Sequence, residues 1–345
     1  MIPFIIRRLL FLPVVFVGVT LGIVLLMQLL SPTQRAASYI SSEAQLRNIE
    51  AIIEQHHLND PWYEQYWAWL QAASRGNFGY SKVARLPVLD AIRARFPSTA
   101  ELAFAAMLPV IGIGIWLGTA AALNRDRLID QVVRVLSILG WSLPTFVLGI
   151  WLLVVFYGGL NWFAPGQINS QHAIDLANGV ADGTFHRFTG FLTLDSLLNG
   201  RFDIFLDVLK HLVLPVVTLA AVSGAQIMRV MRSSLLDALG QDYVRTARAK
   251  GLPESVVNHK HARRNALIPV LTLSGFTIIG LLNGLVITET IYNYPGMGLF
   301  IATAATQLDY PAVLGSAVFT AIIVVLANLV VDVLYGLVDP RIRYA

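Results

Sequence analysis

The amino-acid sequence predicts an all-α membrane protein with six transmembrane helices, and three observations lead to this fold class. Of the 345 residues, 56% are hydrophobic and only 13% are charged, whereas a soluble domain has about 25% charged residues. Six stretches without Asp, Glu, Lys or Arg reach or approach the roughly 20 residues that a helix needs to cross a bilayer. Lys and Arg gather in short loops beside these stretches, which is typical of the cytoplasmic side of a membrane protein.

Each charge-free stretch is predicted to hold one transmembrane helix. The stretches are Leu9–Gln34, Leu102–Asn124, Val135–Gln171, Leu212–Met228, Asn265–Thr288 and Tyr310–Val331. In the first stretch the apolar core, residues 9–30, exceeds the about 7–15 residues of a secretory signal peptide, so we expect a retained first transmembrane helix. Only part of the third stretch is expected to lie in the bilayer. Pro13, Pro109, Pro144 and Pro215 are expected to kink helices.

The distribution of basic residues predicts the side of the membrane that each segment occupies. Residues 1–8, the loop 229–264 and the tail 339–345 carry Lys and Arg, whereas the segment Glu289–Asp309 carries neither. Six spans place both termini on the same side, and the positive-inside rule makes that side the cytoplasm. We therefore expect a multi-pass protein of the plasma (inner) membrane with both termini cytoplasmic.

Two long segments are then expected outside the cell. Residues 31–98 have a helical pattern, and the tryptophans among them suit a membrane interface, so we expect external helices packed on the membrane domain. Residues 161–210 are rich in Asp and Gly but lack the spacing of a calcium-binding loop. We expect this insertion to be a solvated loop with short helices and a candidate docking surface.

Motifs of several catalytic and metal-binding classes are absent from the sequence. It contains no phosphate-binding loop, no HExxH motif and no GxSxG motif. It contains no cysteine, which excludes disulfides and thiolate metal sites. His259 and His261 are two positions apart and point in different directions on a helix. The sequence therefore predicts no catalytic site, no metal site and no cofactor on this chain.

Two polar residues near the fifth stretch are tentative candidates for a translocation path. Asn283 lies within the stretch and could line a polar path or bind another helix. Glu289 lies at the end of the stretch. A carboxylate that is hydrogen-bonded to a neighbouring helix is the simpler interpretation of Glu289, and a position on the path is the alternative.

The segment Asp242–Pro269 carries far more charge than the rest of the chain. A helix is predicted over Ser233–Lys250, ending at Gly251 because glycine is a frequent helix terminator. Pro253 suits the start of a following helix, since it lacks the N–H that would be left unpaired there.

A second, short helix is predicted over Glu254–Lys260, with the Glu254 carboxylate in its first turn. We expect Val256 and Val257 to lie on an exposed and partly apolar surface of this helix. A short amphipathic helix that projects into the cytoplasm can fill a groove on a partner protein.

The segment TARAKG…HARRNALIP, Thr246–Pro269, resembles the EAA loop of ABC importer permeases in the form typical of the dipeptide/oligopeptide/nickel subfamily. Gly251 matches the glycine of that loop, and His261 stands where the general pattern has isoleucine. Other segments that resemble the subfamily are RGNFGYS (Arg75–Ser81), PSTAELA (Pro97–Ala103), SLPTFVLG (Ser142–Gly149), ETIYNYPGMG (Glu289–Gly298), DYP (Asp309–Pro311) and NLVVDVLYGLVDPRIRY (Asn328–Tyr344). The resemblance covers most of the chain, in the same order.

This resemblance implies a type I ABC importer permease fold, in which residues 99–338 form a transmembrane domain of five helices after the first helix. It implies four kinds of partner: a second related permease, two ATP-binding subunits that hold ATP and Mg, an external substrate-binding protein, and membrane lipids; nucleic acid is not among them. The residues that would couple the chain to the ATPases are Ala247, Gly251, Leu252, Pro253, Glu254, Val256, Val257 and His261.

The function that we expect is a permease subunit of an ATP-driven importer of dipeptides or oligopeptides, without enzyme activity of its own. The alternative within the same fold is import of nickel chelates or oligosaccharides. A stand-alone secondary transporter is the alternative from a different class.

Overall fold

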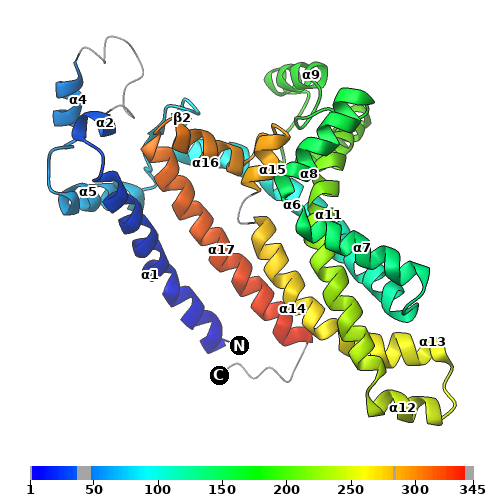
Figure 1. Cartoon of the computed structure of the whole chain (residues 1–345). Helices are drawn as coiled ribbons and strands as arrows, with labels where there is room; N and C mark the ends of the chain where they lie inside the picture. Colours follow the sequence, from blue (N-terminus) through cyan, green and yellow to red (C-terminus); the bar gives the residue numbers. More distant parts are fainter. Residues whose placement is uncertain (1, 37–47, 283–284, 339–345) are drawn as a thin grey trace.

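The protein is almost entirely helical, as the sequence predicts (Figure 1). The computed structural model describes residues 2–36, 48–282 and 285–338. The candidate path residue Asn283 and the tail 339–345 therefore lie outside the described residues. One short antiparallel pair of strands, β1 (Tyr80–Ser81) with β2 (Leu86–Pro87), interrupts the helices of the described chain, and the sequence does not predict it.

Long helices form the membrane part of the molecule. They are α1 (Ile2–Met27), α6 (Val88–Leu123), α7 (Leu128–Ser142), α8 (Thr145–Leu152) with its π-helical continuation η2 (Leu153–Gly159), α11 (Phe202–Leu239), α14 (Arg263–Leu282) and α17 (Tyr310–Val338). α6 begins inside the predicted external segment 31–98, and α11 begins inside the predicted insertion 161–210. Both helices are therefore longer than the charge-free stretches that predict them.

The number of membrane spans in the described residues is four or five. Four continuous helices are long and apolar enough to cross a bilayer: residues 88–123, 202–239, 254–281 and 310–331. α7 and the helix 145–159 make a fifth span if they count as one bent element. Of α1, only the part Pro13–Met27 enters this count, as a shorter apolar helix, so the predicted total of six is not confirmed.

The third predicted stretch is sharply bent. α7 and the helix 145–159 meet at 105°, and Leu143 and Pro144 between them are extended. The proline ring disfavours helical backbone at the residue before it, so the helix ends at Ser142 and begins again after Pro144. The predicted kink at Pro144 is confirmed, whereas Pro109 and Pro215 lie inside helices that continue past them.

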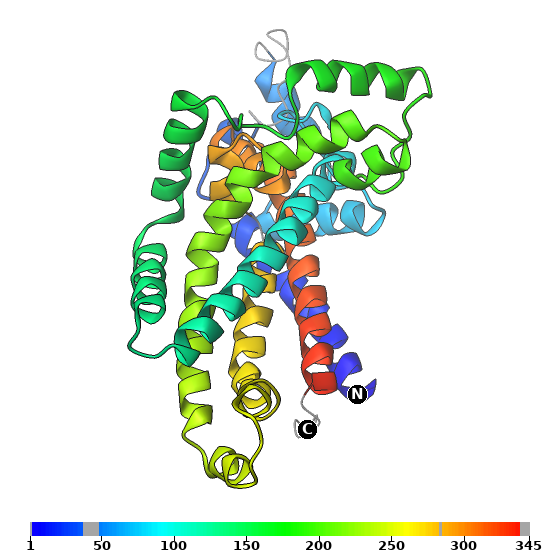
Figure 2. The same cartoon turned by 90° about the vertical axis from the view of Figure 1, so that its right-hand side faces the viewer.

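The centre of the molecule is the pair α6 and α11, which cross closely with α7 and α8 beside α11 (Figure 2). Glycines on α6 permit this approach. A Cβ atom added at Gly114 would lie 2.7 Å from Ile227 Cγ2, and one added at Gly118 would lie 2.6 Å from the Met228 carbonyl oxygen. Small residues at these two positions let the helices approach closely.

The two ends of the molecule differ in character. The start of α1, the end of α17 and the helices α12 (Asp242–Ala249) and α13 (Glu254–Val256) lie at one end (Figure 1). The opposite end carries the shorter helices α2 (Pro32–Ala36), α4 (Ile49–Gln55), α5 (Trp62–Ser74), α9 (Ser170–Ala181), α10 (Leu192–Leu198), α15 (Val286–Ile291) and α16 (Met297–Thr306). This arrangement agrees with an even number of crossings, because both ends of the described chain lie on one side.

Candidate functional site

The tip between α12 and α13 is built around a glycine turn. Gly251 has a φ of 73°, a left-handed conformation that glycine adopts without steric cost. Its N–H donates to the Arg248 carbonyl oxygen at 2.9 Å, and the Leu252 N–H donates to the Ala247 carbonyl oxygen at 3.4 Å. These two bonds are those of the Schellman motif that ends many helices. Pro253 is extended and precedes α13 directly, so the chain reverses at this point.

An ion pair closes the turn. The Arg248 guanidinium donates from Nε to Glu254 Oε1 at 2.8 Å and from Nη2 to Oε2 at 3.3 Å, and both side chains remain exposed. The hydrogen bonds with Glu254 raise the pKa of Arg248 above its ordinary value. Arg248 is not among the predicted coupling residues, although an Arg and a Glu on either side of a Gly-Leu-Pro turn are the signal that could have identified it.

The predicted coupling residues divide into an exposed and a buried group. Gly251, Leu252, Pro253 and Glu254 are exposed, Val256 and His261 are half-buried, and Ala247 and Val257 are buried. The prediction that Val257 lies on an exposed surface is wrong, because its side chain is fully buried in the core cluster that α6, α11 and α14 share. Of the predicted coupling residues, only the four of the turn are therefore exposed to a partner.

Both predicted helices of this loop differ from the structure in extent. The first is divided, because α11 ends at Leu239 and α12 begins at Asp242 after a turn at Gly240. The second is not short: α13 continues through the π-helical segment η3 (Val257–Ala262) into α14. No glycine or proline interrupts this helix between its first turn and Pro269, and burial of Val257 and Ala262 holds it against its neighbours. The exposed turn is thus continuous with a membrane helix.

At the opposite end, two of the quoted motifs bind each other through Glu289. The Thr99 hydroxyl donates to Glu289 Oε1 at 2.6 Å, and the Leu299 N–H donates to Oε2 at 3.0 Å. The Met297 N–H in turn donates to the Thr99 hydroxyl at 2.7 Å. Glu289 is fully buried, and this burial raises its pKa. The simpler interpretation, a helix-end carboxylate bonded to a neighbouring helix, describes the structure, and a role of Glu289 in a translocation path stays a prediction.

A second buried carboxylate, Glu101 on α6, joins this helix to the insertion 161–210. It accepts hydrogen bonds from Gln167 Nε2 at 2.8 Å, the Thr193 N–H at 2.6 Å and the Tyr294 hydroxyl at 3.1 Å. The four groups come from α6, from two places in the insertion (Gln167 near its start and Thr193 on α10) and from the segment after α15. Glu101 therefore fixes α6 to the loops that cover it at the end of the molecule opposite the Gly251 turn.

The DYP and RGNFGYS motifs also meet in space. The buried Asp309 carboxylate accepts from the Ser81 hydroxyl at 2.6 Å and from the Val83 N–H at 3.0 Å. A Cβ atom added at Gly79 would lie 3.0 Å from Pro311 Cβ. This contact holds the β1–β2 hairpin on the start of α17, and it uses residues that are far apart in the sequence.

Two basic residues of the predicted loop 229–264 have structural partners. Arg232 on α11 binds the fully buried Asp130 of α7 through two hydrogen bonds, of 2.5 and 2.8 Å. The Arg229 guanidinium lies 5.1 Å from the centre of the Trp141 ring, within the range of a cation–π contact. Positive-inside topology therefore does not by itself explain these two arginines.

Comparison with known proteins agrees with this architecture. The family model described as "Binding-protein-dependent transport system inner membrane component" matches residues 111–344, and the model for the N-terminal region of such membrane components matches residues 1–103. A probable D,D-dipeptide transport system permease protein of Escherichia coli is 42% identical over 85% of this chain and 84% of its own length.

Two further relatives cover the whole chain. A di/tripeptide transport system permease protein of Pseudomonas aeruginosa is 39% identical, over 100% of this chain and 99% of its own. An oligopeptide transport system permease protein of Bacillus subtilis is 35% identical over the full length of both chains. The chain belongs to the family of inner membrane components of binding-protein-dependent transport systems, and is a multi-pass transport permease rather than an enzyme.

Proposed function

We propose that this chain is a permease subunit of an ATP-driven importer of dipeptides or oligopeptides. The observation that supports this proposal is full-length similarity to permeases whose names specify dipeptide, di/tripeptide and oligopeptide transport. The substrate path would form between this chain and a second, related permease, and an external binding protein would deliver the peptide. ATP and Mg would bind to two separate cytoplasmic subunits.

The proposed topology has six spans in a type I ABC importer permease fold. α1 has 26 residues, which at about 1.5 Å per residue is long enough for a bilayer core. Counting α1 and the bent pair as one span each gives six crossings, with both ends of the chain in the cytoplasm. The basic loop that carries the Gly251 turn then faces the ATPases.

Coupling would start at the exposed turn formed by Gly251, Leu252, Pro253 and Glu254. The Leu252 side chain is 37% exposed and is the apolar group at the tip, so it suits a groove on an ATPase. Because the helix runs without a break from Glu254 to Leu281, a displacement of the tip would move the membrane part of the same helix. The turn would thus act as the end of a lever that changes access to the path.

Replacing Leu252 with Asp tests the coupling role, because a carboxylate would have to be desolvated in the groove. Co-purification of the ATPases should fall by roughly tenfold, as for a central interface residue. Leu197→Asp is the matched control: Leu197 is equally exposed, at 37%, but lies on α10 at the opposite end. Unchanged co-purification in the Leu252 variant would contradict the coupling role.

Cargo is tested by uptake of a radiolabelled dipeptide into liposomes that contain the complete transporter and its binding protein. Uptake should require ATP in the solution that the ATPases face, on the side of the membrane opposite the binding protein. Uptake by this chain alone, driven by an ion gradient, would instead support a secondary transporter.

A further inference from the structure

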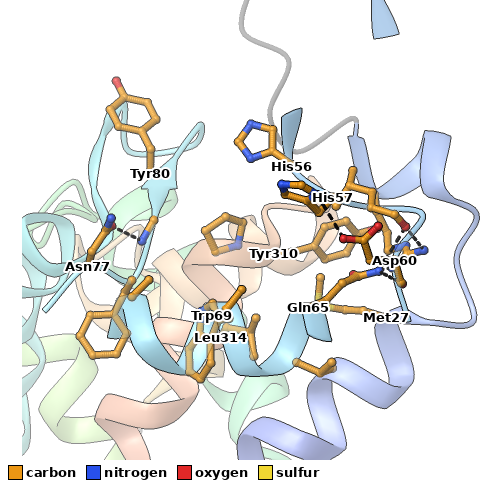
Figure 3. Close-up of a pocket in the computed structure, with 18 of the residues that line it drawn as sticks. Met27, His56, His57, Asp60, Gln65, Trp69, Asn77, Tyr80, Tyr310 and Leu314 are labelled. Carbon is orange, nitrogen blue, oxygen red and sulfur yellow. Dashed lines mark hydrogen bonds and ion pairs between the residues drawn. The ribbon is translucent and has the colours of Figure 1, made fainter. Parts of the chain in front are cut away.

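Two hollows on the described residues differ in the charges that line them. The larger, of about 880 Å³, lies beside Trp69 at the end of the molecule opposite the Gly251 turn (Figure 3). Charges of both signs line it, and its Asp60 carboxylate is already paired with His57 at 3.1 Å. This lining selects no single class of ligand, whereas the charges of the smaller hollow have one dominant sign.

The smaller hollow is a groove of about 330 Å³ between α7 and α11, which pack side by side (Figure 2). Its lining on α11 lies between Met228 and Ser233, in the last third of that helix. Its lining on α7 lies between Val133 and Ser142, before the sharp bend. The groove is therefore formed by two helices of the membrane part, in the half of the molecule that carries the Gly251 turn.

Arginine side chains dominate the polar part of this groove. They are Arg134 on α7 and Arg229 and Arg232 on α11. Arg232 is paired with the fully buried Asp130, whereas Arg134 Nε lies 4.0 Å from that carboxylate, beyond hydrogen-bond distance. Arg229 lies over the Trp141 ring, and within the described chain neither its guanidinium nor that of Arg134 donates a hydrogen bond.

The single carboxylate of Asp130 does not balance three guanidinium groups. The neighbouring Asp126 is exposed and already paired with Arg125 at 3.3 Å. A guanidinium is charged throughout the physiological pH range, and its fork of N–H donors matches the oxygens of a phosphate group. The groove therefore favours an anion, and the two guanidinium groups with unused donors suit a phosphate.

The rest of the groove is apolar and exposed. Ile138 and Trp141 line it and are 60% and 53% exposed, and their neighbours Val135 and Leu139 on α7 are exposed as well. A dissolved anion would leave this surface in water, whereas an acyl chain would cover it. Tryptophan is also common where lipid headgroups meet the hydrocarbon layer. An occupant that satisfies both parts of the groove is an anionic amphiphile.

We propose that the groove between α7 and α11 binds the headgroup of an anionic phospholipid from the cytoplasmic leaflet. Its phosphate oxygens accept hydrogen bonds from Arg134 and Arg229, and an acyl chain packs along Ile138 and Trp141. Basic pockets between transmembrane helices bind anionic headgroups in this way. The choice of leaflet rests on the proposed topology, whereas the binding itself depends neither on the cargo nor on the ATPases.

The test is native mass spectrometry of the full chain after incubation with vesicles of dioleoylphosphatidylglycerol and dioleoylphosphatidylcholine in equal amounts. The two lipids share their acyl chains and differ in net charge, and the wild type should retain one phosphatidylglycerol in preference to phosphatidylcholine. Arg134→Gln combined with Arg229→Gln should lower this retention roughly thirtyfold, at about fivefold for each arginine. The measurement does not depend on orientation, so its failure is distinct from a failure of the proposed topology.

Two further double variants separate the groove from overall charge and from folding. Arg127→Gln combined with Arg264→Gln removes the same charge at exposed positions outside the groove, and should retain the lipid as the wild type does. Arg134→Lys combined with Arg229→Lys keeps the charge of the groove and should keep most of the lipid. Equal retention by the wild type and the Arg134→Gln, Arg229→Gln variant would overturn the proposal.

Three other results would also overturn it. An equal loss in both glutamine double variants would mean that the lipid follows overall charge, and a loss in the lysine variant as large as in the groove glutamine variant would mean that charge does not hold it. Release of the lipid by inorganic phosphate, at an ionic strength matched with sodium chloride, would make the groove a site for a soluble anion. Retention by the chain alone but not by the complete transporter would assign the groove to the second permease.

Discussion

At the residue scale, buried carboxylates fasten segments that are distant in the sequence. Glu289 accepts hydrogen bonds from Thr99 and Leu299, and Asp309 accepts them from Ser81 and Val83. A buried carboxylate is costly unless its oxygens have donors. These sites therefore specify one arrangement of the loops at the end opposite the Gly251 turn, and the space around each carboxylate matters as much as its charge.

Gly296 shows this dependence on space. Its backbone is extended, which any residue adopts, but an added Cβ atom would collide with the Glu289 carboxyl group. Gly296→Ala should lower the free energy of unfolding by about 1–3 kcal/mol, the usual cost of overpacking. The effect is measured as a lower melting temperature in detergent.

Gly280→Ala provides the control for that substitution, because nothing lies within 4 Å of the Cβ position in this exposed site on α14. Alanine is favoured over glycine in a helix, so this variant should melt at the wild-type temperature or slightly above it. A melting temperature of Gly296→Ala equal to that of Gly280→Ala would show that the carboxylate site can relax.

At the scale of elements, one ion pair is buried between two helices and another is exposed at a turn, so we expect them to contribute differently to stability. The pair of Asp130 with Arg232 joins α7 to α11 and has a fully buried carboxylate. The pair of Arg248 with Glu254 closes an exposed turn. Solvent screens an exposed pair strongly, so the first pair should matter for stability and the second for the shape of the tip.

Asp130→Asn should destabilise the protein by about 1–3 kcal/mol, because it leaves Arg232 without its charged partner and exchanges an acceptor for a donor. The melting temperature of the purified chain measures this loss. Asp242→Asn, which alters an exposed pair with Arg245, should leave the melting temperature unchanged. Equal melting temperatures for the two variants would mean that α7 is held by its apolar contacts alone.

A charge exchange tests the tip. Arg248→Glu alone places two carboxylates across the turn and should weaken co-purification of the ATPases, since the turn opens. Arg248→Glu combined with Glu254→Arg restores an opposite-charge pair and should recover most of the binding. If the single and double variants bind equally well, the ion pair does not shape the surface that the ATPase contacts.

At the scale of the whole molecule, the arrangement of the two ends sets the expected orientation. Both ends of the described chain and the Gly251 turn lie together, and the cavity beside Trp69 lies at the other end. The natural absence of cysteine makes this orientation easy to test, because one introduced thiol is the only one present.

Ser74→Cys and Lys250→Cys place a thiol at exposed positions of the two ends. A membrane-impermeant maleimide should label Ser74→Cys from outside intact spheroplasts and should label Lys250→Cys only after permeabilisation. The reverse pattern would invert the proposed topology, and labelling of both from outside would contradict an odd number of crossings between these positions.

Several features were predictable because they depend on local chemistry. The apolar stretches predicted a helical membrane protein, because about 20 consecutive apolar residues match a spanning helix, which satisfies its own backbone hydrogen bonds. The Gly251 turn and the break at Pro144 followed from the conformations that glycine and proline adopt. The helix boundaries near Val88 and Phe202 were not predictable, since polar residues continue both helices beyond the apolar stretches.

The sequence by itself determined the class of the protein, its family and the position of the exposed turn, because each is encoded in composition or in a short run of residues. Only the tertiary structure decided that Val257 is buried, that Glu289 binds Thr99, and that Arg232 binds Asp130. The physical reason is that burial and pairing of a side chain depend on which helices pack against it. Those neighbours come from sequence positions that no local pattern connects.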